Sequence, residues 1–410
     1  MKIVVISRWY SEKMGYIENC LPRALAELGH DVHVVTSTAQ VYFNHPFYEK
    51  SYQNYLGDRI QPVGSSDTEG GVHLHHLPFW SAAGHIWLRG LTNKIKELQP
   101  DIVHTFEHTS PDSVRLALLK KFGDGQFKLF TANHAIYSVL DTARNWAEIS
   151  IFKKLIWHIL QRIPGRFVAS QIERCFAVTS DAGEIAERFL GVPAEKVKVT
   201  TLGVDTVQFH PNTPIRQATR RAFEFTEQDI VVLYTGRLTA QKNPLLVAKA
   251  IEELNKNARN TLQTSTKSVF KGLFIGDGEQ KDAIAAMPNI AILPPQPYRE
   301  LPKFYQAADI AVWAMEESTS QLDAVGSGVC LVLTDKIAAY DCIEEGDSTT
   351  KPKIVSRKFQ HQNFDDLVAQ LASLSDPSVR AALQKQGVAT IEEASSWKVI
   401  ARERVKDYES

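Results

Sequence analysis

At 410 residues the chain exceeds what one hydrophobic core usually organises, which indicates two domains of roughly 200 residues each. Apolar residues make up 44% of it and charged residues 23%, as in a soluble globular protein. The formal net charge of −1 excludes a global attraction to nucleic acid or to an anionic membrane, although a local basic patch can act at short range.

The N-terminus leads directly into an apolar strand, so we expect no signal peptide. No stretch approaches 18 apolar residues, so we expect no membrane span. Cys20, Cys175, Cys330 and Cys342 are widely spaced and form no C-x-x-C pair, which argues against zinc or thioredoxin-like chemistry. We therefore expect buried, reduced thiols in a cytoplasmic protein.

Segments with the pattern of a β-strand alternate with segments with the pattern of a helix along most of the chain, which predicts parallel sheets covered on both faces. A first series of strands is expected at 3–6, 32–36, 72–77, 102–104, 129–131, 176–179 and 197–200. A second series is expected at 231–234, 272–275, 290–293, 310–313, 330–333 and 353–355. Two series predict two doubly wound domains, with the boundary in the proline-containing, strand-free stretch 208–227.

Two segments depart from this alternation. Residues 40–67 are rich in aromatics and show no clear regular structure, which leaves two interpretations: a loop packed on its own rings, or a wall that stacks on acceptor sugars. Residues 151–166 carry apolar residues at helical spacing, several cations and no acidic residue. An ordinary helix facing the core is the favoured interpretation there, and a basic helix lying on anionic lipid is the alternative.

Several residues at strand ends are candidates for binding. Gly15 follows the first strand, where a glycine lets the backbone approach a phosphate. His134 follows the strand at 129–131, at a carboxyl end where open α/β sheets bind ligands. His104 and His108 follow another strand end and are weaker candidates. His73, His75 and His76 look like metal ligands, but their alternation with apolar residues predicts a half-buried strand instead.

The most specific motif is the run Tyr234-Thr-Gly-Arg-Leu-Thr-Ala-Gln-Lys-Asn-Pro244. In it the end of a strand is followed by Gly236, two cations and the start of a helix. Arg237 can fork onto phosphate oxygens and Lys242 can add a point charge. Together with Leu202-Gly-Val-Asp-Thr-Val-Gln-Phe-His-Pro211, it makes the chain resemble the family-4 retaining glycosyltransferases of the GT-B fold (glycosyl transferases group 1).

The resemblance implies two Rossmann-like doubly wound α/β domains that face a cleft, with a C-terminal helix crossing back to the first domain. The acceptor domain would be 1–207 with about 392–410, and the donor domain 208–391. A UDP- or GDP-sugar would be the donor, and a sugar or lipid-linked glycan the acceptor, in cell-envelope or exopolysaccharide assembly. The protein would be cytoplasmic, with peripheral contact at the inner membrane face through 151–166 as an alternative, and it would bind no nucleic acid.

Negative charge builds on the diphosphate as it departs, so transfer needs positive groups close to it. Arg237 and Lys242 are the catalytic candidates for this role. The sequence contains no Asp-x-Asp pair for a bridging metal, so we expect no metal and no cofactor. The resemblance adds His134 as a residue near the reacting sugar, and Gly15 as a diphosphate contact. Gly276 follows another strand and is either a tight turn or a donor contact. No carboxylate is an obvious nucleophile, which favours front-face attack.

The acidic run departs from the family pattern of two glutamates separated by seven residues. Here Glu316 or Glu317 would contact the sugar, and Asp323 the ribose hydroxyls, with shorter spacing and Asp in place of Glu. Ser318, Thr319 and Ser320 could offer N–H groups to phosphate. This departure keeps open a catalytically weak or inactive nucleotide-sugar-binding member. The shared fold leaves a second alternative, a nucleotide-sugar epimerase or a phosphorylase.

Overall fold

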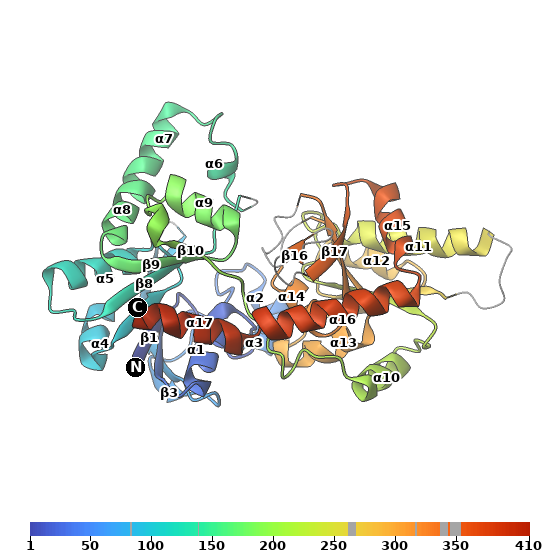
Figure 1. Ribbon diagram of the computed structural model, residues 1–410, viewed down its shortest axis with the longest axis horizontal. Helices are drawn as coiled ribbons and strands as arrows, with labels where there is room; N and C mark the ends of the chain where they lie inside the picture. Colours follow the sequence, from blue (N-terminus) through green and yellow to red (C-terminus); the bar gives the residue numbers. More distant parts are fainter. Residues whose placement is uncertain (83, 138, 261–267, 316–317, 337–342, 345–353) are drawn as a thin grey trace. The chain divides into compact units, whose positions relative to one another are not determined.

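A computed structural model describes the chain except residues 83, 138, 261–267, 316–317, 337–342 and 345–353 (Figure 1). The chain divides into two compact units, Met1–Leu202 with Trp397–Ser410, and Gly203–Ser396. We call them unit 1 and unit 2. The division falls after Leu202, a few residues before the position expected at 207, and the last helix belongs to unit 1.

Unit 1 is built on a sheet of eight strands in which all neighbours pair in parallel except β3, which is antiparallel to β4. Its spatial order is β10 (Val197–Val199), β9 (Ile172–Ala177), β8 (Lys128–Asn133), β7 (Ile102–Thr105), β1 (Lys2–Ile6), β2 (Asp31–Ser37), β4 (His73–Leu77) and β3 (Gly64–Asp67). The central strands are apolar and buried because helices cover the sheet. Every strand expected in this unit has a counterpart, although the one expected at 176–179 begins earlier and is β9.

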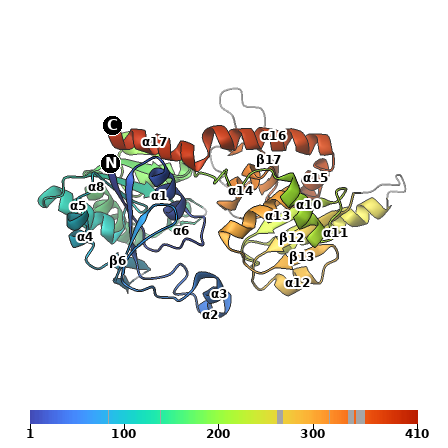
Figure 2. The same ribbon diagram turned by 90° about the horizontal axis from the view of Figure 1, so that it is seen from below.

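The helices of unit 1 follow its strands. They are α1 (Ile17–Glu27), α4 (Leu91–Leu98), α5 (Pro111–Phe122), α6 (Asp141–Arg144), α7 (Ile151–Trp157), η1 (His158–Arg162), α8 (Ile163–Ala169), α9 (Ser180–Arg188), the short turn η2 (Ala194–Lys196) and α17 (Trp397–Glu409). The C-terminal helix α17 packs beside α1, as Figure 2 shows. Thus α17 completes the core of unit 1.

The aromatic segment 40–67 is more regular than its sequence indicates. It contains α2 (Tyr48–Ser51), α3 (Gln53–Leu56) and the edge strand β3, so the expectation of an irregular loop was wrong. Tyr48 is fully buried in a small separate cluster with Val41 and Leu56, and the rings of Tyr42 and Tyr52 lie in tilted contact with centroids 4.8 Å apart. The rings therefore serve packing. A separate two-stranded hairpin that we did not predict, β5 (Phe79–Ala82) and β6 (His85–Leu88), lies outside the main sheet of unit 1.

Unit 2 contains a sheet of seven strands whose neighbours all pair in parallel. The order is β13 (Ile290–Leu293), β12 (Phe270–Ile275), β11 (Ile230–Thr235), β14 (Ile310–Trp313), β15 (Cys330–Thr334), β17 (Ile354–Phe359) and β16 (Ile343–Glu344). All six residues of β11 are buried, as expected for a central parallel strand. The expected strands are again present, and β16 is an addition.

The helices of unit 2 cover this sheet. They are α10 (Thr213–Ala222), α11 (Pro244–Asn260), α12 (Lys281–Ala285), η3 (Tyr298–Glu300), α13 (Leu301–Ala307), α14 (Ser320–Gly326), α15 (Phe364–Ser373) and α16 (Pro377–Ala394). In Figure 1, α11 and α15 lie on one side of the strands, and α13, α14 and α16 lie on the other. Because the strands alternate with crossing helices, the loops that lead from strand to helix gather at the carboxyl ends of the strands.

Candidate functional site

Two glycine loops meet at the carboxyl ends of β11 and β12 in unit 2. The amide of Gly236 donates to the Ile275 carbonyl at 3.0 Å, and Leu238 donates to the Asp277 carbonyl at 2.9 Å. Gly276 has φ 156°, and a Cβ there would lie 1.8 Å from the Gly236 carbonyl oxygen. Only glycine permits this approach, so Gly276 has at least a packing role.

Both candidate cations lie on the loop between β11 and α11. Arg237 is exposed and Lys242 is half-buried, while Leu238 between them is fully buried and anchors the loop. The Tyr234 hydroxyl also holds the loop, because it donates to the Arg237 carbonyl at 3.0 Å. The strand and helix thus place two positive side chains on one short loop, the arrangement that can neutralise a diphosphate.

An acidic neighbour shares this loop. Glu279 accepts a hydrogen bond from the Ala240 amide at 2.6 Å. This bond, together with the charge of Arg237, lowers the pKa of the Glu279 carboxyl. The amide of Leu245 in the first turn of α11 donates to the Gln280 side chain at 3.2 Å. Residues 279 and 280, which the sequence did not single out, therefore support the cation loop from the β12 side.

Asp323 is buried in α14, with 6% of its surface exposed. The Tyr298 hydroxyl donates to its carboxylate at 3.4 Å. Burial raises the pKa of Asp323 well above its ordinary value, which favours the protonated carboxyl. Close by, the Tyr305 hydroxyl lies 2.8 Å from Thr235 at the end of β11. Asp323 is therefore part of a buried polar cluster beside the strand ends.

The rest of the acidic run is only partly described. Glu316 and Glu317 lie outside the described residues. Ser318, Thr319 and Ser320 are half-buried just before and at the start of α14, and the Ser320 amide donates to the Ser318 hydroxyl at 3.3 Å. The three hydroxyl residues therefore lie at the amino end of α14, the helix that carries Asp323.

In unit 1, His134 follows β8 directly, and its ring meets the edge of Phe106 at 5.8 Å between centroids. Burial, aided by the charge of Arg404, lowers the pKa of His134 to about 4, so the neutral imidazole is the stable form near pH 7. Arg404 comes from α17, and its guanidinium lies 3.4 Å from the centroid of Phe176. Sequence reasoning missed Arg404, because a charged residue on an amphipathic helix normally points to water.

The other two histidines of this region are structural. The imidazole of His104 lies 2.6 Å from the Tyr408 hydroxyl, and His108 bonds both the Thr131 hydroxyl and the Gly165 carbonyl at 2.9 Å. His104 Nδ1 and both ring nitrogens of His108 are therefore engaged within the core, whereas His104 Nε2 is buried without a hydrogen-bond partner among the described residues.

A small cavity of about 50 Å³ lies at the carboxyl ends of β1 and β7. Four charged residues line it: Arg8, Glu18, Glu107 and Asp112. Arg8 pairs with Glu107, burial raises the pKa of Glu18 to about 7, and burial also raises that of Asp112 to about 6. The sequence did not reveal this group because its members are far apart in the chain, although Arg8 and Glu107 each follow a strand end.

Gly15 lies in the loop between β1 and α1, half-buried and three residues before Glu18. Its neighbours tie this loop to the aromatic segment, since the Tyr55 hydroxyl donates to the Lys13 carbonyl and the hydroxyls of Tyr16 and Tyr42 lie 2.6 Å apart. The first-strand loop is therefore held by segment 40–67.

The helix at 151–166 presents its apolar residues to solvent, so the core-facing interpretation was wrong. Neither α7 nor η1 contains a buried residue. The inner side is instead occupied by Trp157, which donates to the Phe189 carbonyl at 3.1 Å, and by Gly165, which packs against Leu190. The exposed apolar residues are Ile151, Phe152, Leu155, Ile156, Ile159, Leu160 and Ile163, which we call the outer face. In the described part of the chain, none of the helices has both the length and the apolar content to cross a membrane.

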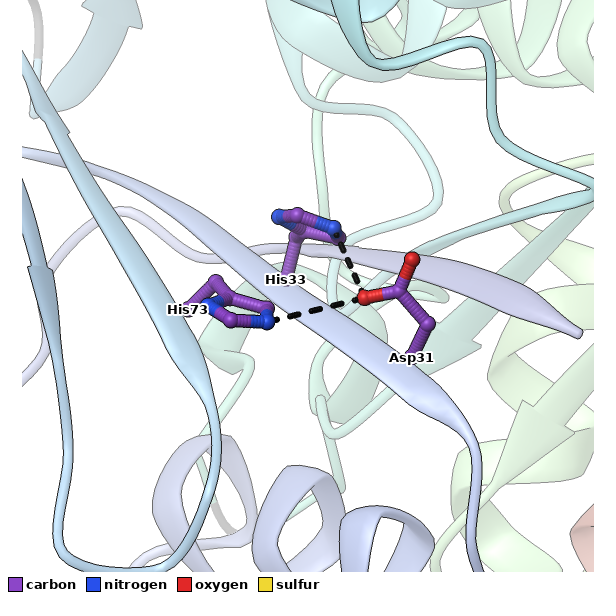
Figure 3. A group of neighbouring side chains, drawn as sticks. All are labelled: Asp31, His33 and His73. Carbon is purple, nitrogen blue, oxygen red and sulfur yellow. Dashed lines mark ion pairs between the residues drawn. The ribbon is translucent and has the colours of Figure 1, made fainter.

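A third polar group lies at the opposite, amino ends of β2 and β4. Residues 73–77 form strand β4, as expected. However, the structure brings Asp31, His33 and His73 together (Figure 3), with possible ligand atoms within 4.8 Å of one another. It is the one group of three or more such side chains found among the described residues, and adjacent strands, rather than adjacent sequence, create it.

Two family models match the chain in succession. The model described as Glycosyltransferase Family 4 matches residues 21–208, and the model described as Glycosyl transferases group 1 matches residues 215–388. A protein named D-inositol 3-phosphate glycosyltransferase from Geodermatophilus obscurus is 28% identical over 170 residues, covering 40% of this chain and 37% of that protein. One of the same name from Nocardia farcinica is 24% identical over 264 residues, covering 61% and 55%. The matched regions thus span less than two thirds of these relatives.

Solved structures resemble the chain over nearly its whole length. A glycosyltransferase from Rickettsia africae has a TM-score of 0.67 at 14% identity, covering 100% of this chain and 97% of that chain. Sucrose-phosphate synthase from Thermosynechococcus elongatus gives 0.69 at 14%, covering 100% and 98%, and Anabaena HepE in complex with UDP-glucose gives 0.65 at 14%, covering 99% and 98%. These likenesses confirm the expected fold class: two Rossmann-like α/β domains of the GT-B type.

Proposed function

Because the chain belongs to the glycosyltransferases that combine a family 4 domain with a group 1 domain, we propose that it moves a sugar from a UDP- or GDP-sugar to a hydroxyl acceptor with retention of configuration. The observation that carries this proposal is the loop between β11 and α11, which bears Arg237 and Lys242 at a strand end. A solved relative of this fold, Anabaena HepE, is in complex with UDP-glucose, which supports a nucleotide-sugar donor.

In the proposed reaction the acceptor oxygen attacks the anomeric carbon while the bond from that carbon to the diphosphate oxygen breaks. The nucleoside diphosphate leaves with the bonding electrons, and the acceptor proton passes to the departing phosphate. Arg237 and Lys242 stabilise the charge that builds up on the diphosphate, so no divalent ion is required. Such donors act most strongly where they are already fixed in place, and the buried anchor Leu238 fixes this loop.

The remaining residues receive supporting roles in this proposal. Neutral His134 offers a ring nitrogen to a sugar hydroxyl, because its pKa of about 4 keeps the ring uncharged. Asp323 and the 318–320 segment contribute to the nucleotide side, Gly236 and Gly276 allow close backbone approach, and Gly15 contributes to the diphosphate side. We assign the first acidic role to Glu316 or Glu317.

The test of the proposal is donor hydrolysis with a panel of UDP- and GDP-sugars, preceded by a thermal-shift screen of the nucleotides and their sugars. A bound ligand raises the melting temperature by mass action. We expect one donor both to stabilise the protein and to be hydrolysed slowly without acceptor. Tight nucleotide binding in calorimetry without turnover of any donor would instead support the binding-protein alternative, which the altered acidic run favours.

We further propose that the acceptor is a lipid-linked glycan of envelope or exopolysaccharide assembly, which the protein reaches through the outer face of α7, η1 and α8. Ile151 is 85% exposed and Phe152 is 70% exposed, values suited to insertion among lipid tails. The exposed cations Lys153 and Arg166 lie in the same acid-free stretch and are suited to anionic headgroups. Helices of this kind lie in the membrane interface, with the apolar face roughly 5–10 Å deep.

Vesicle co-sedimentation tests this contact. We expect the wild type to bind vesicles that contain phosphatidylglycerol, and the F152S/L160S double variant to bind at least about tenfold less, since each lost side chain removes apolar transfer energy. V207S, which changes an exposed apolar residue outside the outer face, is the matched control. Equal binding by the wild type and the double variant would refute the contact. It would also be refuted if light scattering showed that the wild type and V207S are dimers and that the double variant is a monomer, because the outer face would then pair two copies of the chain.

A further inference from the structure

We propose that Asp31, His33 and His73 form a binding site for a divalent cation of the zinc class. Asp31 and His33 are the first and third residues of β2, and His73 is the first residue of β4. The two strands pair in parallel, in a register that sets His33 opposite His73 (Figure 3). Two imidazole nitrogens with one carboxylate oxygen are a donor set that zinc accepts in sites with an open fourth position.

The distances within the group suit a shared ion. Asp31 Oδ1 lies 3.1 Å from His33 Nε2 and 3.7 Å from His73 Nε2. Zinc holds nitrogen and oxygen ligands at roughly 2.0–2.2 Å, so two ligands of one ion lie at most about 4 Å apart. The Nε2 atoms of both rings point toward the same carboxylate oxygen, as Figure 3 shows. An ion placed among the three atoms would therefore meet all of them with small side-chain rotations.

The other nitrogen of each ring is already engaged, which is the mark of an oriented ligand. His73 Nδ1 lies 2.6 Å from the Asp67 carboxylate, so this ring can donate there and present Nε2 as a lone pair. His33 Nδ1 lies 3.0 Å from His75 Nε2, and His75 Nδ1 lies 2.7 Å from the Ser65 hydroxyl. Carboxylate and hydroxyl partners of this kind fix the tautomer and raise ligand basicity in metal sites.

The position of the group defines what the ion would do. Asp67 and Ser65 belong to β3, the edge strand of the sheet, whereas Asp31 and His33 belong to β2. The ion with its supporting bonds would therefore tie β2, β4 and β3 together at their ends. Asp31 and His73 are about half exposed, so a water molecule can fill the fourth position. Because binding to the folded state alone stabilises it, the ion would stabilise the edge of unit 1 without taking part in transfer.

The experiment is calorimetric titration of the EDTA-treated, desalted full-length protein with Zn²⁺, together with visible absorption after Co²⁺ addition and a melting curve with each ion. We expect one tight site, tetrahedral Co²⁺ bands and a higher melting temperature. H73Q and D31N should lose this site, and D67N should weaken it by about 10–100-fold, the usual effect of removing a carboxylate that supports a ligand. H76Q is the matched control, because residue 76 alternates with 73 and 75 along β4.

Three outcomes would overturn the proposal: no stoichiometric Zn²⁺ binding by the wild type, undiminished binding by H73Q and D31N, or an equal loss in H76Q. Circular dichroism of each metal-free variant checks that it is folded, and D31N is the mildest change because the Asp31 side chain is about half exposed and Asn is nearly isosteric with Asp. The readouts do not involve turnover, so they stand even if the proposed transfer reaction is wrong.

Discussion

The imidazole Nδ1 of His104 and the phenol oxygen of Tyr408 lie 2.6 Å apart, although 304 residues separate them in the chain. Both side chains are buried, and the Tyr408 ring also contacts Phe130 in a tilted arrangement, with centroids 4.9 Å apart. The bond fixes α17 to the central strand β7, so the end of the chain is an integral part of the core of unit 1.

Replacing Tyr408 with Phe should lower the free energy of unfolding by about 1–3 kcal/mol, because the His104 nitrogen would remain buried without its partner. Urea denaturation followed by fluorescence measures the change. Y42F is the control: Tyr42 bonds another hydroxyl at the exposed surface, where water can replace the lost partner. Equal losses in the two variants would contradict a special role for the buried bond.

The stability of unit 1 should depend on the ionisation of His108. Burial lowers the pKa of this ring from 6.5 to about 4, so the unfolded chain binds the proton more readily. Its contribution is therefore complete above about pH 6.5 and is lost as the pH falls toward about 4. Glu18 and Asp112 act in the opposite direction, because their pKa values are raised and their contributions fall as the pH rises toward about 7 and 6.

The H108Q variant isolates the histidine from those carboxyls. Between pH 7 and pH 5 the free energy of unfolding of the wild type should fall by about 2 kcal/mol more than that of H108Q. Denaturant titrations at the two pH values measure this difference. Parallel pH dependence of both proteins would show that His108 keeps an ordinary pKa in the fold.

Removing either cation of the β11–α11 loop should slow transfer. R237A and K242A should each lower kcat by about 100-fold or more, by analogy with other lost donors that stabilise developing charge. K249A removes an exposed cation from α11 nearby and should leave kcat unchanged. Steady-state kinetics with the identified donor measure the effect, and a change confined to KM would assign the cations to ground-state binding instead.

Chelation should leave transfer intact, because the two cations are proposed to carry the charge of a bridging metal. Rates measured with EDTA and with added Mg²⁺ should agree within error. A rate that EDTA abolishes and Mg²⁺ restores would mean that the donor diphosphate needs a metal after all. If EDTA lowers the melting temperature and leaves the transfer rate unchanged, the chelator has removed an ion from the group of Asp31, His33 and His73 only.

The buried charge pair between α10 and Asp309, the residue directly before β14, should be essential for unit 2. Arg220 is 1% exposed and donates to Asp309 at 3.2 Å, and Asp309 also accepts from the Val231 amide at 2.8 Å. D309A should therefore destabilise the protein by about 3–5 kcal/mol, since it leaves a buried guanidinium uncompensated. K256A breaks an exposed pair with Glu252 and should change stability by under about 1 kcal/mol.

The sequence by itself determined the repeating α/β architecture, because strand and helix periodicity are local properties that survive in any parallel sheet. It also determined which loop carries Arg237 and Lys242, since strand, glycine and helix start are adjacent in the chain. It could not predict β3 or the β5–β6 hairpin, which are short and lack a continuous apolar pattern.

Only the tertiary structure decided which side of a helix meets the core. The apolar stripe at 151–163 predicted a buried helix, yet Trp157 and Gly165 occupy the inner side and leave the stripe in water. The charged cavity and the Asp31 group likewise arise from strand order, which joins residues far apart in sequence. Hydrophobic periodicity shows that one face of a helix is apolar, but the tertiary packing determines which neighbours, if any, cover that face.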